Sequence, residues 1–167
     1  MKKKVLLFPW LLVLFLLSCS VTAPTVRSYS SIDGYKYVYI TPTSDKTSVS
    51  GTTVGTRYGV YGSTESTSTS PADLISGHFI KRGYIRQPEI NPDFVLQTII
   101  VNYGETNREK DAFGYRIEAT IQIISAKTNE LICVGTAEGY AEKEADALRN
   151  AVNSCMDAIF TWHENNK

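Results

Sequence analysis

The sequence predicts an α+β domain of two layers, in which a mostly antiparallel sheet carries two helices on one face. Three observations predict this fold. Several segments alternate apolar and polar residues and are rich in β-branched and aromatic side chains. Two other segments show helical spacing with start and stop signals. The order along the chain is strand, long arm, helix, three strands and helix, and 167 residues suit a single domain.

The first predicted strand covers residues 35–40, where β-branched and aromatic residues are dense. Residues 41–70 are mostly Ser, Thr and Gly, and they bury too little apolar surface to offset their ordering entropy. Three interpretations of this arm stay open: a mobile loop or weak hairpin, an element that pairs with a partner strand or its own copy, and a membrane-spanning hairpin. The last lacks the roughly ten residues of clean apolar alternation that each spanning strand needs.

The first helix is predicted over residues 70–82. Ser70 is a hydroxyl cap, Pro71 suits the first helical position, and Gly83 is the usual left-handed stop. Four-residue pairs define the side that faces inward: Leu74 with His78, and Ile75 with Phe79.

Three strands follow. Residues 94–101 form a near-continuous apolar run that predicts a central strand, and the charged residues 104–111 predict a turn. Residues 115–124 alternate almost perfectly, and Asn129 suits a left-handed turn before an antiparallel return over 131–137. The inward side of the alternating strand is formed by Ile117, Ala119, Ile121 and Ile123.

The closing helix is predicted over residues 142–162, with acidic residues in its first turn. Its apolar residues follow 3-4-3-4-3 spacing, which predicts a buried stripe. The stripe consists of Ala145, Leu148, Val152, Cys155, Ile159 and Trp162.

The first residues have the parts of an export signal. Three lysines precede an apolar run, residues 5–17, which is shorter than the about 20 residues that span a bilayer. Leu16-Leu17-Ser18-Cys19 resembles the lipobox of bacterial lipoproteins. The resemblance implies cleavage after Ser18 and acylation of Cys19 by fatty acids such as palmitate. The alternatives are an ordinary signal peptide and an uncleaved helical anchor, which Pro9 disfavours.

The lipoprotein reading divides the chain into a signal peptide (1–18), a lipidated tether (19–31) that holds the domain off the membrane, the domain (32–162) and a tail (163–167). In the lipoproteins that it resembles, a residue such as Ser20 after the cysteine favours the outer membrane, and the absence of an acidic tag favours the periplasmic side.

The charge of the mature chain argues against binding to nucleic acid. The three lysines lost from 17 basic residues leave 14 against 17 acidic residues, a net charge of −3. Cys133 and Cys155 remain after Cys19 is assigned to lipid. They either form a disulfide, which the exported compartment permits, or stay as two buried thiols.

Three short motifs carry a wider resemblance. They are Pro92-Asp93-Phe94, Thr128-Asn129-Glu130-Leu131 and Gly135-Thr136-Ala137. Over residues 31–162 the chain resembles small bacterial lipoproteins of the Bacteroides type with an uncharacterised periplasmic domain. It is loosely similar to the curli-secretion and penicillin-binding-protein-activator lipoproteins. The resemblance implies an envelope component that acts by binding, and the family offers no catalytic residues to carry over.

Metal and catalytic sites are not predicted, and neither is a cofactor. His78 and His163 lack Cys or carboxylate neighbours at metal-ligand spacing, and there is no Gly-x-Ser-x-Gly elbow. An acidic cluster around the start of the last helix is explained by the helix dipole and water, with a calcium site as the alternative. Its members are Glu138, Glu142, Glu144 and Asp146.

Tyr35, Tyr37 and Tyr39 share one face of the first predicted strand, and Val38 and Ile40 share the other. If the helices cover the Val38 face, the tyrosines line an open face that suits contact with a protein or glycan. The alternative is that the rings are covered or pack across strands.

These observations predict a periplasm-facing lipoprotein of the outer membrane that binds or assembles with protein partners of the envelope and is not an enzyme. One alternative is a subunit of an oligomeric export or envelope assembly that pairs through the arm. Another is an envelope enzyme of unknown reaction.

Overall fold

The structure is a computed structural model that describes residues 21–56 and 59–166. The predicted signal peptide, the cleavage after Ser18 and the lipidation of Cys19 lie outside the described residues. Within these residues, no helix has both the length and the apolar character needed to cross a bilayer.

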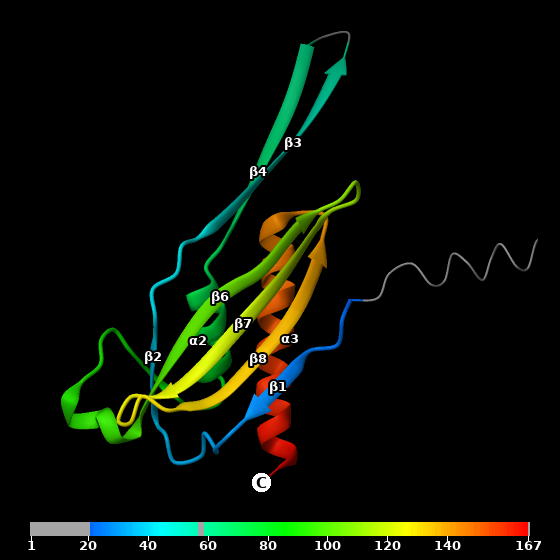
Figure 1. Ribbon diagram of the computed structural model, residues 1–167. Helices are drawn as coiled ribbons and strands as arrows, with labels where there is room; N and C mark the ends of the chain where they lie inside the picture. The colour runs from blue at the N-terminus through cyan, green and yellow to red at the C-terminus, as the bar shows by residue number, and fades with distance from the viewer. Residues whose placement is uncertain (1–20, 57–58, 167) are drawn as a thin grey trace, which may run out of the picture.

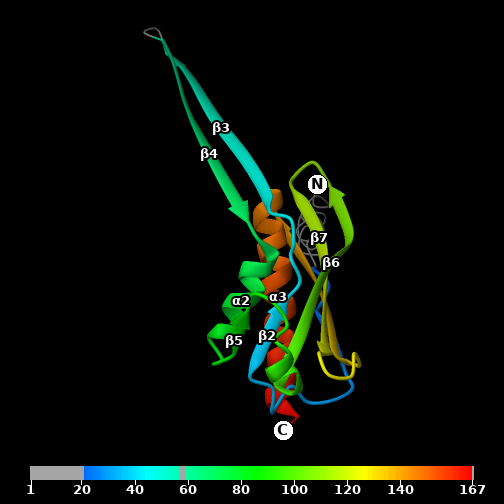
Figure 2. The ribbon, with the colours of Figure 1, turned by 90° about the vertical axis from the view of Figure 1, so that its left-hand side faces the viewer.

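A six-stranded sheet and two helices form two layers, as the sequence predicts (Figures 1 and 2). The sheet order is β1-β8-β7-β6-β2-β5. Neighbours from β1 to β6 are antiparallel, whereas β2 runs parallel to both β6 and β5. The strands are β1 (Thr25–Ser28), β2 (Tyr37–Ile40), β5 (Ile85–Gln87), β6 (Thr98–Lys110), β7 (Tyr115–Ser125) and β8 (Leu131–Ala141). The helices are α2 (Pro71–Ile80) and α3 (Glu144–Asn165).

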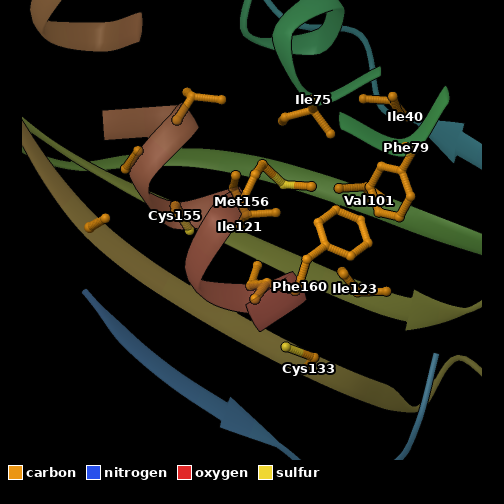
Figure 3. Close-up of a cluster of buried hydrophobic side chains, with 14 of the residues drawn as sticks. Ile40, Ile75, Phe79, Val101, Ile121, Ile123, Cys133, Cys155, Met156 and Phe160 are labelled. Atoms are coloured by element: carbon orange, nitrogen blue, oxygen red, sulfur yellow. The ribbon is translucent and has the colours of Figure 1, made fainter. Parts of the chain in front are cut away.

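The core lies between the helices and one face of the sheet. The four inward residues predicted for β7 are all buried, which confirms the alternation. Figure 3 shows two of them, Ile121 and Ile123. Helix α3 buries its predicted stripe up to Ile159 and continues it four residues later with buried His163, whereas Trp162 is only half-buried. Phe160, beside the stripe, is buried as well. A spacing of four instead of three follows the drift of a helix with 3.6 residues per turn.

The two cysteines of the domain are free thiols buried in this core, one on β8 and one on α3 (Figure 3). This is one of the two alternatives that the sequence left open. Burial raises the pKa of Cys133 to about 11 and that of Cys155 to about 12. Both groups are therefore protonated and weakly nucleophilic at neutral pH.

The second predicted strand is shifted along the chain. Residues Pro92–Gln97 form a 3-10 helix, η1, and β6 begins only at Thr98. Asn91 caps η1 by accepting a hydrogen bond from the backbone N–H of Asp93, with Pro92 at the first helical position. The predicted turn at 104–111 is wrong, because β6 continues through it to Lys110 and pairs with β7 across a bulge after Glu105.

The sheet also begins earlier than the sequence predicts. Residues Thr25–Ser28, placed in the tether, form β1 and pair with the edge of β8. Further upstream, the backbone N–H of Thr22 donates a hydrogen bond of 3.1 Å to a carboxylate oxygen of Glu138. The part of the chain expected to hold the domain off the membrane is thus attached to the domain from Thr22 onward.

The arm forms a hairpin that projects from the domain (Figure 1). Its strands, β3 (Lys46–Thr56) and β4 (Gly59–Thr69), pair in a single register along their whole length. They form a separate two-stranded sheet, and within the described residues neither strand pairs with any other. The arm is therefore a paired hairpin and not a mobile loop.

Candidate interaction surfaces

Charged residues fix the first strand of the arm to the domain. The Lys46 ammonium lies 3.5 Å from a carboxylate oxygen of Glu105 on β6. Glu105 also pairs closely with Arg108, beyond the bulge, and Arg108 forms a 2.9 Å ion pair with Glu144 in the first turn of α3. The arm, the sheet and α3 therefore meet in one ionic network, which we call the arm clamp: Lys46, Glu105, Arg108 and Glu144.

The second strand of the arm is held separately. The Arg149 guanidinium on α3 donates a 3.2 Å hydrogen bond to the hydroxyl of buried Thr69, the last residue of β4, and a 2.8 Å bond to Asp146. The start of α2 is attached as well, because the Ala72 N–H donates to the Thr43 hydroxyl. Since both strands are held at the base, the direction of the hairpin is set by the domain.

The clamp keeps Glu105 ionised. Burial alone would raise the pKa of this carboxyl, but hydrogen bonding to Arg108 and the charges of Arg108 and Lys46 outweigh burial and lower it. The neighbouring Tyr103 hydroxyl responds in the opposite direction: burial, reinforced by the Glu105 charge, raises its pKa. Tyr103 is consequently neutral and Glu105 negative at neutral pH.

We expect Glu105→Gln to lower the free energy of unfolding at pH 7 by about 1 kcal/mol, since it removes the charge that Arg108 and Lys46 share. The folded-state pKa lies below the unfolded value of about 4.3, so the stabilisation is present above that pH and is lost as the pH falls through the folded pKa. Urea titrations of wild type and variant from acid to neutral pH should converge at the acid end. The exposed Glu109→Gln variant is the control, and a Glu105→Gln difference independent of pH would contradict the clamp.

The predicted tyrosine surface is divided. Val38 and Ile40 are buried beneath the helices, so the other face of β2 is the open one. Tyr37 stacks on Phe94 of η1 with ring centroids 4.7 Å apart, and Tyr39 is half-buried on the same face. Tyr35 precedes the strand and packs against the core. Two of the three predicted tyrosines, Tyr37 and Tyr39, therefore lie on the open face, whereas Tyr35 does not belong to this surface.

The open face is polar towards its other end. The Thr120 hydroxyl lies 3.0 Å from that of Thr136, and Gln122 beside it is exposed. Farther along, Arg116 donates a 3.1 Å hydrogen bond to Glu138 and lies over the ring of Tyr140. These contacts between neighbouring strands order the side chains of a face that neither helix covers.

A groove of about 720 Å³ separates the base of the arm from the turn between β6 and β7. Asp111 holds this turn by accepting hydrogen bonds from the N–H groups of Phe113 and Gly114 and from the Tyr140 hydroxyl. The Phe113 N–H makes the largest contribution to lowering the pKa of this carboxyl. The groove is lined by Thr47, residues 110–115 and residues 142–144.

The predicted acidic cluster does not gather at one point. Glu138 pairs with Arg116 on the open face, while Glu144 and Asp146 pair with different arginines on the helix side. Glu142 lines the groove. Among the described residues, no group of three or more His, Cys, Asp or Glu is arranged to hold a metal ion.

The two histidines have different places. On α2, His78 lies 3.0 Å from the Asn153 side-chain oxygen and 3.4 Å from Asp157, so it joins α2 to α3. His163 is buried near the end of α3, with its ring edge-to-face against Trp162. His163 lies beyond the predicted end of the helix at residue 162, but α3 continues to Asn165 and the His163 ring continues its buried stripe.

Sequence reasoning missed the arm clamp because residues 104–111 were assigned to a turn. One signal was present: Ile99, Val101, Tyr103 and Glu105 share one parity and continue a single face of β6. The bulge then shifts that parity by one residue and turns Arg108 to the same side. A bulge has no such periodic signature in the sequence.

No protein-family model and no curated protein matches the chain. Two similar solved structures are PelC dodecamers from Paraburkholderia phytofirmans. The first, a PelC variant in space group C2, is 12% identical with a TM-score of 0.46, over 83% of this chain and 95% of that chain. The second, in space group P6, is 8% identical with a TM-score of 0.46, over 84% and 97%. Likeness of this degree establishes neither the family nor the function of the chain.

Proposed function

We propose that this chain is a lipid-anchored component of the bacterial envelope that acts by binding and assembly, without catalysis, and that the β3–β4 arm is its contact element. One observation carries the proposal: a two-stranded hairpin projects from the domain while both of its strands are fixed at the base. Such an arrangement presents backbone hydrogen-bonding groups at a defined angle. Strand pairing with a partner is the interaction that it suits.

The arm has little to stabilise it alone. An isolated two-stranded hairpin is marginal in water, and each of these strands has an outer edge that pairs with nothing else in the described chain. Residues 46–69 contain only three charged residues, Lys46, Arg57 and Glu65, and no proline. Charges and prolines are the usual protection of strand edges, so these edges are open to another strand. A second copy of the arm is the partner that is always present.

The membrane attachment rests on the sequence. The pattern around Cys19 resembles a lipobox, and the residue that follows it favours the outer membrane with the domain on the periplasmic side. The wider resemblance to small envelope lipoproteins agrees with a role in binding. The alternative of an envelope enzyme is weaker, since Glu138, Glu144 and Asp146 are each paired with an arginine in structural contacts.

Removal of the arm tests the proposal. Thr47 and Ser68 are paired across the hairpin, so residues 48–67 can be replaced by an Asn-Gly turn that keeps the register and both attachments at the base. Light scattering of the detergent-solubilised full chain should show an oligomer, and the shortened chain should be a monomer. A shortened chain with the same mass per particle as the full chain would overturn the role of the arm.

A matched variant keeps the arm and alters the other candidate surface. Tyr39→Ser removes a ring from the open face without touching the arm or its clamp. We expect its assembly to equal that of the full chain. Fatty-acid labelling of cells, with Cys19→Ala as control, tests the anchor independently.

A further inference from the structure

The turn between β6 and β7 exposes a large aromatic side chain on a rigid support. Phe113 is 83% exposed, the most of any large apolar residue described. The turn is held by the three hydrogen bonds to Asp111, at 2.7, 2.8 and 3.2 Å. Gly114 packs directly against the backbone carbonyl of Ala141, where a larger residue would collide. The exposed ring is thus presented by a well-ordered turn and contributes little to the core.

The start of the described chain is attached close to this turn. The Thr22 N–H bonds to Glu138, and this bond makes the largest contribution to lowering the pKa of that carboxyl. Cys19 precedes Thr22 by three residues, which span at most about 10 Å. The covalent chain therefore limits the distance between the acylated residue and the Glu138 carboxylate to about 13 Å, which includes the 3.1 Å hydrogen bond of Thr22.

Glu138 and the turn lie at the same end of the open face. The antiparallel ladder between β7 and β8 ends at the pair Tyr115 and Ala141, three residues and about 10 Å from Glu138. Contacts bridge this interval: Arg116 joins Glu138 to the ring of Tyr140, whose hydroxyl donates to Asp111. Thr22, three residues after the predicted lipid attachment, and the turn that carries Phe113 therefore lie at the same end of the open face.

We propose that the β6–β7 turn inserts Phe113 into the headgroup region of the bilayer beside the acylated Cys19, and that this contact fixes the orientation of the domain. The inference rests on the proposed lipid anchor and adds a second attachment to it. The acyl chains provide the affinity for the membrane, and the single apolar ring on a rigid turn determines the angle between the domain and the membrane plane. The arm leans away from this turn towards the helix side of the sheet (Figure 2), so docking through the turn leaves the arm free to pair with another strand.

Tryptophan fluorescence in membranes tests the inference. The predicted mature chain has one tryptophan, Trp162, near the C-terminal end of α3 and far from the turn (Figure 1). The double variant Phe113→Trp, Trp162→Phe places the only tryptophan at the turn. The acylated protein is reconstituted into vesicles of phosphatidylethanolamine and phosphatidylglycerol, with and without bromine on the acyl chains. We expect brominated lipid to quench this fluorescence by about half, because the ring lies at the acyl boundary.

The matched control is Leu96→Trp in the same Trp162→Phe background. Leu96 is also exposed, at 63%, but it belongs to η1 at the opposite end of β6. Equal quenching of the two variants, or none in either, with acylation verified by mass, would overturn the docking and leave the lipid anchor standing. An unacylated chain recovered in the aqueous fraction would overturn the anchor and, with it, the docking.

Discussion

Gly139→Ala should lower the free energy of unfolding by about 3 kcal/mol or more, enough to prevent folding of a marginally stable domain. Gly139 lies on β8 where α3 crosses the sheet. A Cβ at this position would overlap the carbonyl oxygen of Ala147 and the backbone nitrogen of Ala151. Because both atoms belong to the helix backbone, no side chain can turn aside to make room. To make room, helix α3 as a whole must move away from the sheet, which disrupts the packing of the buried core between them.

Thermal and urea unfolding followed by circular dichroism measure this effect. Gly104→Ala is the matched control, since Gly104 also lies in the sheet but no heavy atom comes within 4 Å of the added Cβ. We expect the control to change stability by less than about 1 kcal/mol. Similar values for the two variants would mean that α3 does not pack against Gly139 as closely as the structure has it.

Regular periodicity is the part of the fold that the sequence predicts well. Three predicted features are found: the alternation in β7, the stripe of α3 up to Ile159 and the two left-handed residues. The φ angle is 86° at Gly83, which follows the first helix, and 58° at Asn129, in the turn between β7 and β8. These features depend on neighbouring residues within one element, so the local sequence pattern is sufficient to predict them. The class of fold follows because each amphipathic element has one face to bury.

Features that depend on a distant partner could not be predicted in this way. β1 is a strand only because the edge of β8 accepts it, and its four residues are too few for a periodic signal. The charged end of β6 has the composition of a turn, yet it continues to pair with β7 beyond a bulge. The arm clamp combines residues from the arm, β6 and α3, so no spacing along the chain indicates it.

Phe79→Ala should have the other large effect, a loss of about 3–5 kcal/mol. Phe79 is fully buried on α2, with its ring edge-to-face against Phe160 at 5.2 Å and against Tyr84 at 5.1 Å (Figure 3). Truncation leaves a cavity between α2 and α3, and such a cavity adds to the lost apolar burial. Since α2 starts two residues after β4 ends, loosening α2 should also loosen the base of the arm.

Phe79→Leu separates these two consequences. It keeps most of the apolar volume and should cost clearly less than Phe79→Ala, although it loses both ring contacts. Amide exchange would report on the arm: Thr69 and Ala72, near its base, should exchange faster in Phe79→Ala under conditions where α3 stays protected. Unchanged protection at these amides in a destabilised Phe79→Ala chain would show that the clamp on Lys46 and the Arg149 contact hold the arm without help from α2.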